Sequence, residues 1–177
     1  MRFLPTLTLL LCLSTSRVGA VQLADGTSAF TRSPRLLDFM TTMSSVSVWG
    51  AKYYLTIDFP AGAQEGLQSV AIQQKQGTED IQFDLQKTFA FFGDRDNRQE
   101  AIPIREVTRD DGGNISIVFE RAIDSGRTVT IGLVPYQNPF YDGVYLFGVT
   151  AFPTGDKPRG LYLGVGRLQF YRGGSAW

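Results

Sequence analysis

The strongest constraint on the fold is that apolar residues recur at every second position, in short runs, from about Ala29 onward. In residues 53–59 the odd positions are large and apolar, whereas the even positions include Thr56 and Asp58, and Pro60 follows. Successive side chains of a strand point to opposite faces, so each run has one apolar face and one wet face. Proline ends the run because it has no backbone N–H. The pattern therefore predicts half-buried β-strands.

Turn signals separate these runs along the whole chain. Residues 111–114 (DGGN) supply residues that tolerate positive φ between two alternating runs, and residues 124–126 and 153–158 are further turns. Residues 65–76 also fit a helical stripe, but we favour a strand. The further predicted strands contain Val70 with Ile72, Ile81 with Phe83 and Leu85, Val107, Ile115 to Phe119, Val129 to Leu133, Val144 to Phe152, and Leu161 to Tyr171.

Short alternating strands at this spacing predict an all-β domain over residues 34–171. The expected architecture is an immunoglobulin-like antiparallel β-sandwich of about seven to nine strands. Three glycines, Gly148, Gly164 and Gly166, interrupt the last two runs. Glycine inside a strand indicates a bulge or a close approach of two backbones. Residues 172–177 are predicted to be a frayed C-terminal tail.

The first twenty residues have the pattern of a secretory signal peptide. Arg2 precedes an apolar run from Phe3 to Leu13, and small or polar residues then lead to Ala20, after which cleavage is expected. The run is shorter than the ~20 apolar residues that an anchored helix needs, and no stop-transfer segment follows it. Lipidation of Cys12 is an alternative, although the bulky residue before it is unfavourable. We expect an exported protein with no transmembrane segment after cleavage, in which residues 21–33 form a flexible lead-in.

Two residue types that much enzyme chemistry needs are missing from the predicted mature chain. The chain has no histidine, and its single cysteine, Cys12, lies in the predicted signal peptide. These absences exclude most zinc, copper and haem sites, Ser-His-Asp triads and Cys-His dyads. We therefore predict no cofactor, no metal site and no enzymatic activity. Basic and acidic residues balance at 17 each, which gives no electrostatic basis for binding nucleic acid.

The leading hypothesis is a non-catalytic binding or structural module of the cell envelope, whose partner is an unknown envelope protein or a glycan. One alternative is a small outer-membrane β-barrel, because alternating strands also build such barrels. Its strands run to about ten residues, whereas most runs in this chain are shorter. Another alternative is a carboxylate-based hydrolase such as a glycosidase, which needs two Asp or Glu side chains in one cleft.

Several segments together resemble one protein family. They are Val70 to Gln74 (VAIQQ), Ile81 to Asp84 (IQFD), Gly143 to Pro153 (GVYLFGVTAFP), Pro158, Gly160 and Leu163 to Tyr171 (LGVGRLQFY). Over residues 34–171 the chain is similar to the cyanobacterial exported proteins catalogued as domain of unknown function 2808. The resemblance implies a secreted protein of a photosynthetic bacterium, in the periplasm, the thylakoid lumen or outside the cell. It implies no activity and no catalytic residues.

The best candidate for a ligand site is the segment at residues 135–143 (PYQNPFYDG). Two prolines bar it from a central strand, so it is predicted to be a loop on the surface. Aromatic rings beside amide and carboxylate groups are typical of sugar and peptide sites. The candidate ligand-binding residues are Tyr136, Asn138, Phe140, Tyr141 and Asp142. We favour the interpretation that Tyr136 and Phe140 instead fold back to cap the end of the sandwich.

Three other clusters have simpler interpretations. Residues 94–100 and 110–114 carry carboxylate and amide oxygens that suit calcium, but the first is better explained as a solvated loop and the second as a hairpin turn. Phe89 and Phe91 share one face of a predicted strand, so at least one of its faces is expected to be buried. Phe92 is then left as a possible surface anchor.

Overall fold

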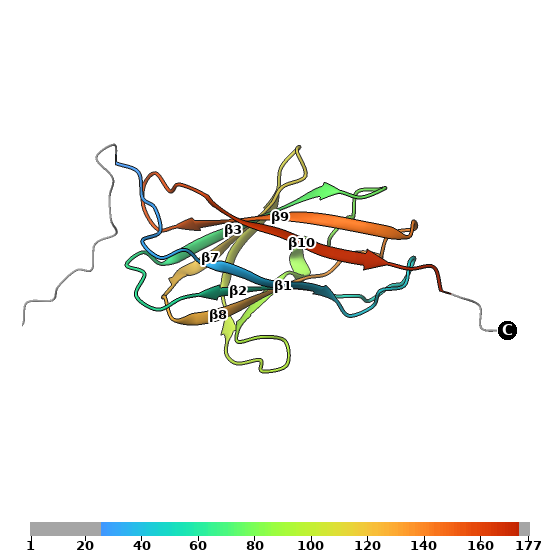
Figure 1. Cartoon of the computed structure of the whole chain (residues 1–177), viewed down its shortest axis with the longest axis horizontal. Helices are drawn as coiled ribbons and strands as arrows, with labels where there is room; N and C mark the ends of the chain where they lie inside the picture. The colour runs from blue at the N-terminus through green and yellow to red at the C-terminus, as the bar shows by residue number, and fades with distance from the viewer. Residues whose placement is uncertain (1–25, 174–177) are drawn as a thin grey trace, which may run out of the picture.

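The chain folds into two stacked antiparallel β-sheets, and the computed structural model describes residues 26–173 (Figure 1). The first sheet, in spatial order, contains β1 (Arg35–Thr41), β2 (Tyr53–Phe59), β8 (Arg127–Leu133), β4 (Phe89–Phe92) and β5 (Ala101–Ile102). The second contains β10 (Leu161–Phe170), β9 (Gly143–Pro153), β3 (Leu67–Gln76), β7 (Ile115–Ile123) and β6 (Ile104–Arg109). A short 3-10 helix, η1 (Leu85–Lys87), precedes β4.

This is the immunoglobulin-like antiparallel β-sandwich that the alternation predicts. The described residues form ten strands rather than about seven to nine, partly because β5 has two residues and is too short to show a period. Residues 67–76 are a strand, as favoured over a helix. The two sheets are open and separate. Within residues 26–173, no helix has the length and hydrophobicity to cross a membrane.

The core lies between the sheets, where alternate residues of each strand meet. In the central pair of the first sheet, Leu55 of β2 opposes Ile131 of β8, and both are fully buried. Their neighbours Thr56 and Thr130 point to the other face and share a hydrogen bond of 3.1 Å. Each fully buried apolar side chain contributes about 1.5–3 kcal/mol relative to an exposed one. The period-two pattern is thus the main source of stability.

The edge strands β1 and β10 bring the two sheets together along one flank (Figure 1). Phe39 of β1 lies over Gly166 of β10, where an added Cβ would sit 2.4 Å from the Phe39 ring. The same ring packs edge-on against Phe147 of β9, with ring centroids 5.1 Å apart. The absence of a side chain at Gly166 therefore lets Phe39 of β1 pack closely against the backbone of β10, which is one of the reasons for a glycine inside a strand.

A second apolar cluster lies on the outer face of the first sheet. Phe89 and Phe91 stack with ring centroids 6.2 Å apart, and Tyr54 of β2 packs edge-on against both. Arg98 covers these rings, with its guanidinium carbon 4.7 Å from the centroid of Phe91. Phe91 is buried, as expected, but by an arginine from the next loop rather than by the core. Phe92 points inward and packs against the core instead of serving as a surface anchor.

Residues 81–85 differ from the predicted strand. Only Phe83 pairs there, in an isolated bridge with Pro135, and η1 begins two residues later. Proline lacks the N–H that would continue the ladder, and Lys87 N–H closes a turn onto the carbonyl of Asp84. The alternation at Ile81, Phe83 and Leu85 is real, but it belongs to a chain segment that turns along the end of the sandwich.

The expected flexible lead-in, residues 21–33, is packed against the sandwich where it is described. The Ser28 N–H donates to the carbonyl of Lys157 over 3.0 Å. The Thr31 N–H donates over 2.7 Å to the carboxylate of Glu65, which is buried. These bonds depend on residues far along the chain, so local composition did not reveal them. The predicted signal peptide and residues 174–177 lie outside the described residues.

Candidate functional site

Exposed aromatic side chains gather at one end of the sandwich, where β1, β8 and β10 end and β9 begins (right-hand end of Figure 1). In the described part of the chain six aromatic side chains are strongly exposed, and five of them belong to this end. We call this surface the aromatic end and define it by Trp49, Tyr136, Phe140, Tyr141 and Tyr171, which are 52–69% exposed. They come from the β1–β2 loop, the β8–β9 loop and the residue after β10.

A buried amide holds these segments together. Asn138, in the middle of the β8–β9 loop, accepts a hydrogen bond of 2.9 Å from the Tyr53 hydroxyl. Its Nδ2 donates to the carbonyls of Met43 and Ser45 in the β1–β2 loop, each over 2.8 Å. A buried polar group must be hydrogen-bonded, so one side chain fixes both loops against the core. The two loops that carry most of the aromatic end are therefore fixed to the core by one buried side chain.

Backbone bonds reinforce the contact between the two loops. The Ser47 N–H donates to the carbonyl of Pro139, and the Asn138 N–H donates to the carbonyl of Val48, both over 2.9 Å. After β10, the Tyr171 N–H donates to the carbonyl of Ser44 over 2.8 Å. The rings of the aromatic end thus stand on loops whose backbones are paired with one another, which limits the entropy lost on binding.

Glu79 fixes the far side of the β8–β9 loop. One oxygen of its carboxylate accepts the backbone N–H of Phe140 over 2.5 Å and that of Tyr141 over 3.0 Å. The hydroxyl of Tyr145, in β9, donates to the carbonyl of Tyr141 over 3.0 Å. Burial, and then the charge of Glu79, raises the pKa of the Tyr145 phenol. This hydroxyl therefore stays protonated at neutral pH and continues to donate.

A cleft opens beside two of the exposed rings. It has a volume of about 240 Å³ and is lined by residues 79–82 and 136–140. Tyr136 and Phe140 supply its rings, whereas Asp80 and Gln82 supply exposed polar groups. We call it the aromatic cleft. Its composition combines apolar surfaces with hydrogen-bonding groups, as ligand sites do.

A second cleft shares one wall with the first. It has a volume of about 260 Å³ and is lined by Gln74, Asp80, Gln82 and residues 109–113 of the β6–β7 hairpin. The guanidinium of Arg109 donates to the side-chain oxygen of Gln82, which lines both clefts. We call this the polar cleft. Asp80 and Gln82 form the ridge between the two clefts.

The family of the chain follows from its sequence over the same domain. The model of the family described as "Protein of unknown function (DUF2808)" matches residues 27–170, which include every strand of the sandwich. The chain belongs to the DUF2808 family. This agrees with the resemblance seen in the sequence. No curated protein matches the sequence.

Solved structures of other proteins resemble this DUF2808 chain only distantly. The collagen-binding subdomain ACE19 of the Enterococcus faecalis surface protein ACE is 9% identical, with a TM-score of 0.46, over 78% of this chain and 98% of that chain. The bacterial hydrophobin BslA is 12% identical, with a TM-score of 0.46, over 81% of this chain and 98% of that chain. A collagen-binding domain from a Staphylococcus aureus adhesin is 12% identical, with a TM-score of 0.41, over 77% and 98%.

The structure separates the five candidate residues of the DUF2808 chain into different roles. Tyr136, Phe140 and Tyr141 are exposed, so the favoured interpretation that Tyr136 and Phe140 cap the sandwich is wrong. The cap fails because the loop is held by Asn138 and Glu79, which leaves the rings outside. Asn138 is buried and satisfied by the scaffold, so its side chain does not face a ligand. Asp142 is exposed and forms an ion pair of 2.8 Å with Arg172.

Sequence reasoning missed two members of the aromatic end, Trp49 and Tyr171. Trp49 lies in a loop rich in serine and valine, where an isolated tryptophan is itself a signal for a surface contact. Tyr171 was included in the last predicted strand, but β10 ends one residue before it. Nothing in the local sequence indicates that either ring lies near the β8–β9 loop.

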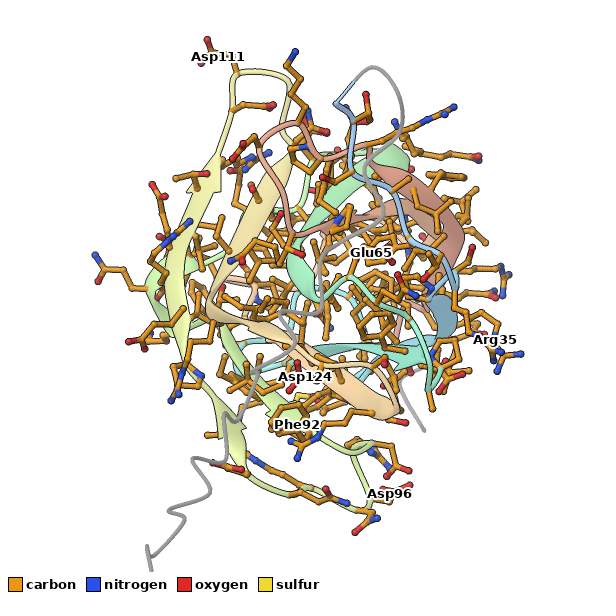
Figure 2. The ribbon with its side chains drawn as sticks, turned by 90° about the vertical axis from the view of Figure 1, so that its left-hand side faces the viewer. Arg35, Glu65, Phe92, Asp96, Asp111 and Asp124 are labelled. Carbon is orange, nitrogen blue, oxygen red and sulfur yellow. The ribbon has the colours of Figure 1, made fainter. Side chains whose placement is uncertain are left out.

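The two acidic clusters are turns. Asp94 accepts the backbone N–H groups of Asp96 and Asn97, and Asp110 accepts that of Asn114, so both carboxylates close loops. Figure 2 shows Asp96 and Asp111 at the tips of separate loops on opposite sides of the molecule. In residues 26–173, no group of three or more His, Cys, Asp or Glu side chains is placed to hold a metal ion.

Proposed function

We propose that this DUF2808 protein is a non-catalytic binding module of the cell envelope that engages its ligand through the aromatic end. One observation carries the proposal: five large rings are more than half exposed at one end, on loops that are braced from beneath. Grouped exposed apolar surface on a soluble domain is typical of an interaction site. Aromatic rings also offer a large contact area at a small cost in side-chain entropy.

The chemistry of the clefts favours binding over catalysis. Hydrogen bonds from Asn114 hold the pKa of the Asp110 carboxyl below its ordinary value, which is the opposite of what a general acid requires. Glu79, the other acidic side chain beside Asp80 in the aromatic cleft, is engaged by the backbone of the β8–β9 loop. The absence of histidine removes the commonest acid–base catalyst. A ligand held in these clefts meets donors, acceptors and rings.

The proposal includes export. Residues 1–20 have the n-region, apolar core and small-residue site of a signal peptide, and we propose cleavage after Ala20. The mature chain then begins at Val21, and it lies in the periplasm, the thylakoid lumen or outside the cell. Intact-mass measurement of the protein recovered from cell fractions tests both points. A full-length chain in the cytoplasmic fraction contradicts the export proposal and leaves the binding proposal unaffected.

The binding proposal is tested with paired variants. Tyr136→Ala/Phe140→Ala removes two rings of the aromatic end, whereas Tyr162→Ala removes an exposed ring near the start of β10, at the opposite end. Wild-type and variant chains are applied to a glycan array and to immobilised envelope extract, after thermal melts establish that all are folded. We expect the double variant to lose binding by about tenfold or more and Tyr162→Ala to retain it. Equal binding by all three chains contradicts the proposal.

A further inference from the structure

The aromatic cleft and the polar cleft lie next to each other, with volumes of about 240 and 260 Å³. Asp80 and Gln82 line both, so a ligand that leaves one cleft enters the other across a single ridge. Two adjoining clefts with a shared wall suit a ligand made of repeating units, which can place successive units in them.

The backbone around the aromatic cleft is already hydrogen-bonded within the protein. The Tyr136 N–H donates to the carbonyl of Gln82, and the Ile81 N–H donates to the side chain of Gln74, both over 3.0 Å. The backbone N–H of Phe140 is taken by Glu79. An extended peptide usually binds by pairing with an open strand edge, and these three N–H groups are not available for such pairing. Recognition through the side chains of the cleft is therefore favoured.

The side chains that line the two clefts suit hydroxyl groups. Tyr136 and Phe140 offer ring faces to the apolar side of a sugar ring, while the exposed Asp80 offers acceptor oxygens. In the polar cleft, Arg109 supplies donors and Asp111 supplies further acceptors. Sugar hydroxyls donate and accept, so they match a surface of mixed donors and acceptors.

We infer that the two clefts are consecutive subsites for one oligosaccharide chain, with the first sugar unit against Tyr136 and Phe140 and the next against the β6–β7 hairpin. This inference rests on the proposed function, because the aromatic cleft belongs to the aromatic end. It adds a ligand class and a direction: the glycan runs from the β8–β9 loop over Asp80 and Gln82 toward Asp111.

Binding is measured by titration calorimetry on the purified chain with the cello-, chito- and malto-series, each from the monosaccharide to the hexasaccharide. The affinity for the matching series rises with length until both clefts are filled and then levels off. In Asp111→Ala, which changes a residue of the polar cleft alone, the gain with length falls by about tenfold, as expected for losing hydrogen bonds to a charged group, while the monosaccharide binds as before. Asp124 is an exposed aspartate in the β7–β8 turn, at the end that faces the viewer in Figure 2. Asp124→Ala is therefore the matched control, and we expect it to leave every affinity unchanged.

The outcomes separate the two proposals. If oligosaccharides bind and Tyr136→Ala/Phe140→Ala abolishes binding, but affinity does not depend on length or on Asp111, the subsite inference is overturned and the proposed function stands. If a hexapeptide of alternating lysine and serine binds at the aromatic end and no oligosaccharide does, the glycan class is overturned. Sugar binding that survives Tyr136→Ala/Phe140→Ala overturns both.

Discussion

The Tyr53 hydroxyl donates a hydrogen bond of 2.9 Å to Oδ1 of Asn138, although 85 residues separate the two in the chain. Tyr53 begins β2 and its ring lies in the core, against Phe83 and Phe170. Burial raises the pKa of its phenol, so the hydroxyl stays protonated and continues to donate. This bond links the apolar core to the loop that presents Tyr136 and Phe140. The position of the aromatic end is thus set from inside the sandwich.

Replacing Asn138 with alanine is expected to destabilise the fold. The change leaves the buried Tyr53 hydroxyl without its acceptor and the carbonyls of Met43 and Ser45 without their donor. Unsatisfied buried groups of this kind cost about 1–3 kcal/mol each, and partial access of water reduces the sum, so we expect a loss of about 2–4 kcal/mol. Urea unfolding followed by fluorescence measures it.

Tyr53→Phe is the matched partner of this variant, because it removes only the hydroxyl. A double-mutant cycle with Asn138→Ala isolates the bond between the two side chains, and we expect a coupling of about 1 kcal/mol. Additive effects of the two substitutions would show that Asn138 braces the loops without help from Tyr53.

Tyr141→Ala should leave the stability within about 0.5 kcal/mol of the wild type. The ring is 52% exposed, and the bonds at this position use the backbone of Tyr141, which alanine retains. Thermal unfolding of the two chains under identical conditions makes the comparison. A loss well beyond 0.5 kcal/mol means that the ring packs into the structure in solution, which removes Tyr141 from the aromatic end.

The sequence was sufficient for the fold because period-two burial acts on neighbouring residues. The strands around Leu55, Ile117 and Ile131 could be predicted from their own side chains and from the turns at 111–114 and 124–126. Once each run has one apolar face, stacking two sheets is the way to bury all of them.

The candidate site was less predictable because it depends on contacts between distant segments. The loop at residues 135–143 could be identified from its prolines and aromatics, but not the direction in which its rings point. That direction is decided by Glu79 and by carbonyls near Met43, which lie some sixty and ninety-five positions away. The stacked rings of Phe89 and Phe91 are a second example of a contact that the sequence did not reveal. They are covered by Arg98, which belongs to a loop whose sequence looks fully solvated.

Gly166→Ala is expected to destabilise the contact between the two sheets. A Cβ at this position would lie 2.4 Å from the ring of Phe39 and 2.5 Å from its Cβ, so the edge strands β1 and β10 would have to separate. Overpacking of this kind costs about 1–3 kcal/mol. Gly173→Ala is the control, because nothing lies within 4 Å of an added Cβ there.

A second substitution checks the cause of this loss. Phe39→Leu lowers stability by itself, since Phe39 is buried, but it makes room beside residue 166. The double variant should therefore be more stable than the sum of the two single effects predicts, by about 0.5 kcal/mol or more in chemical denaturation. Strictly additive losses would place the strain elsewhere in β10.

The hairpin turn between β6 and β7 gives the chain a pH dependence whose sign follows from Asp110. Hydrogen bonds from the side chain and backbone of Asn114 lower the pKa of the Asp110 carboxyl from its ordinary value of 3.8. A carboxyl with a depressed folded-state pKa stabilises the fold above the pKa it has when unfolded, and this contribution disappears as the pH falls through the folded value.

We therefore expect the titration midpoint of Asp110, followed by carboxyl carbon NMR, to lie below 3.8. Asn114→Ala keeps the backbone bond but removes the side-chain bond, so the midpoint should move part of the way back. A wild-type midpoint at or above the ordinary value would mean that the turn is not closed by Asp110.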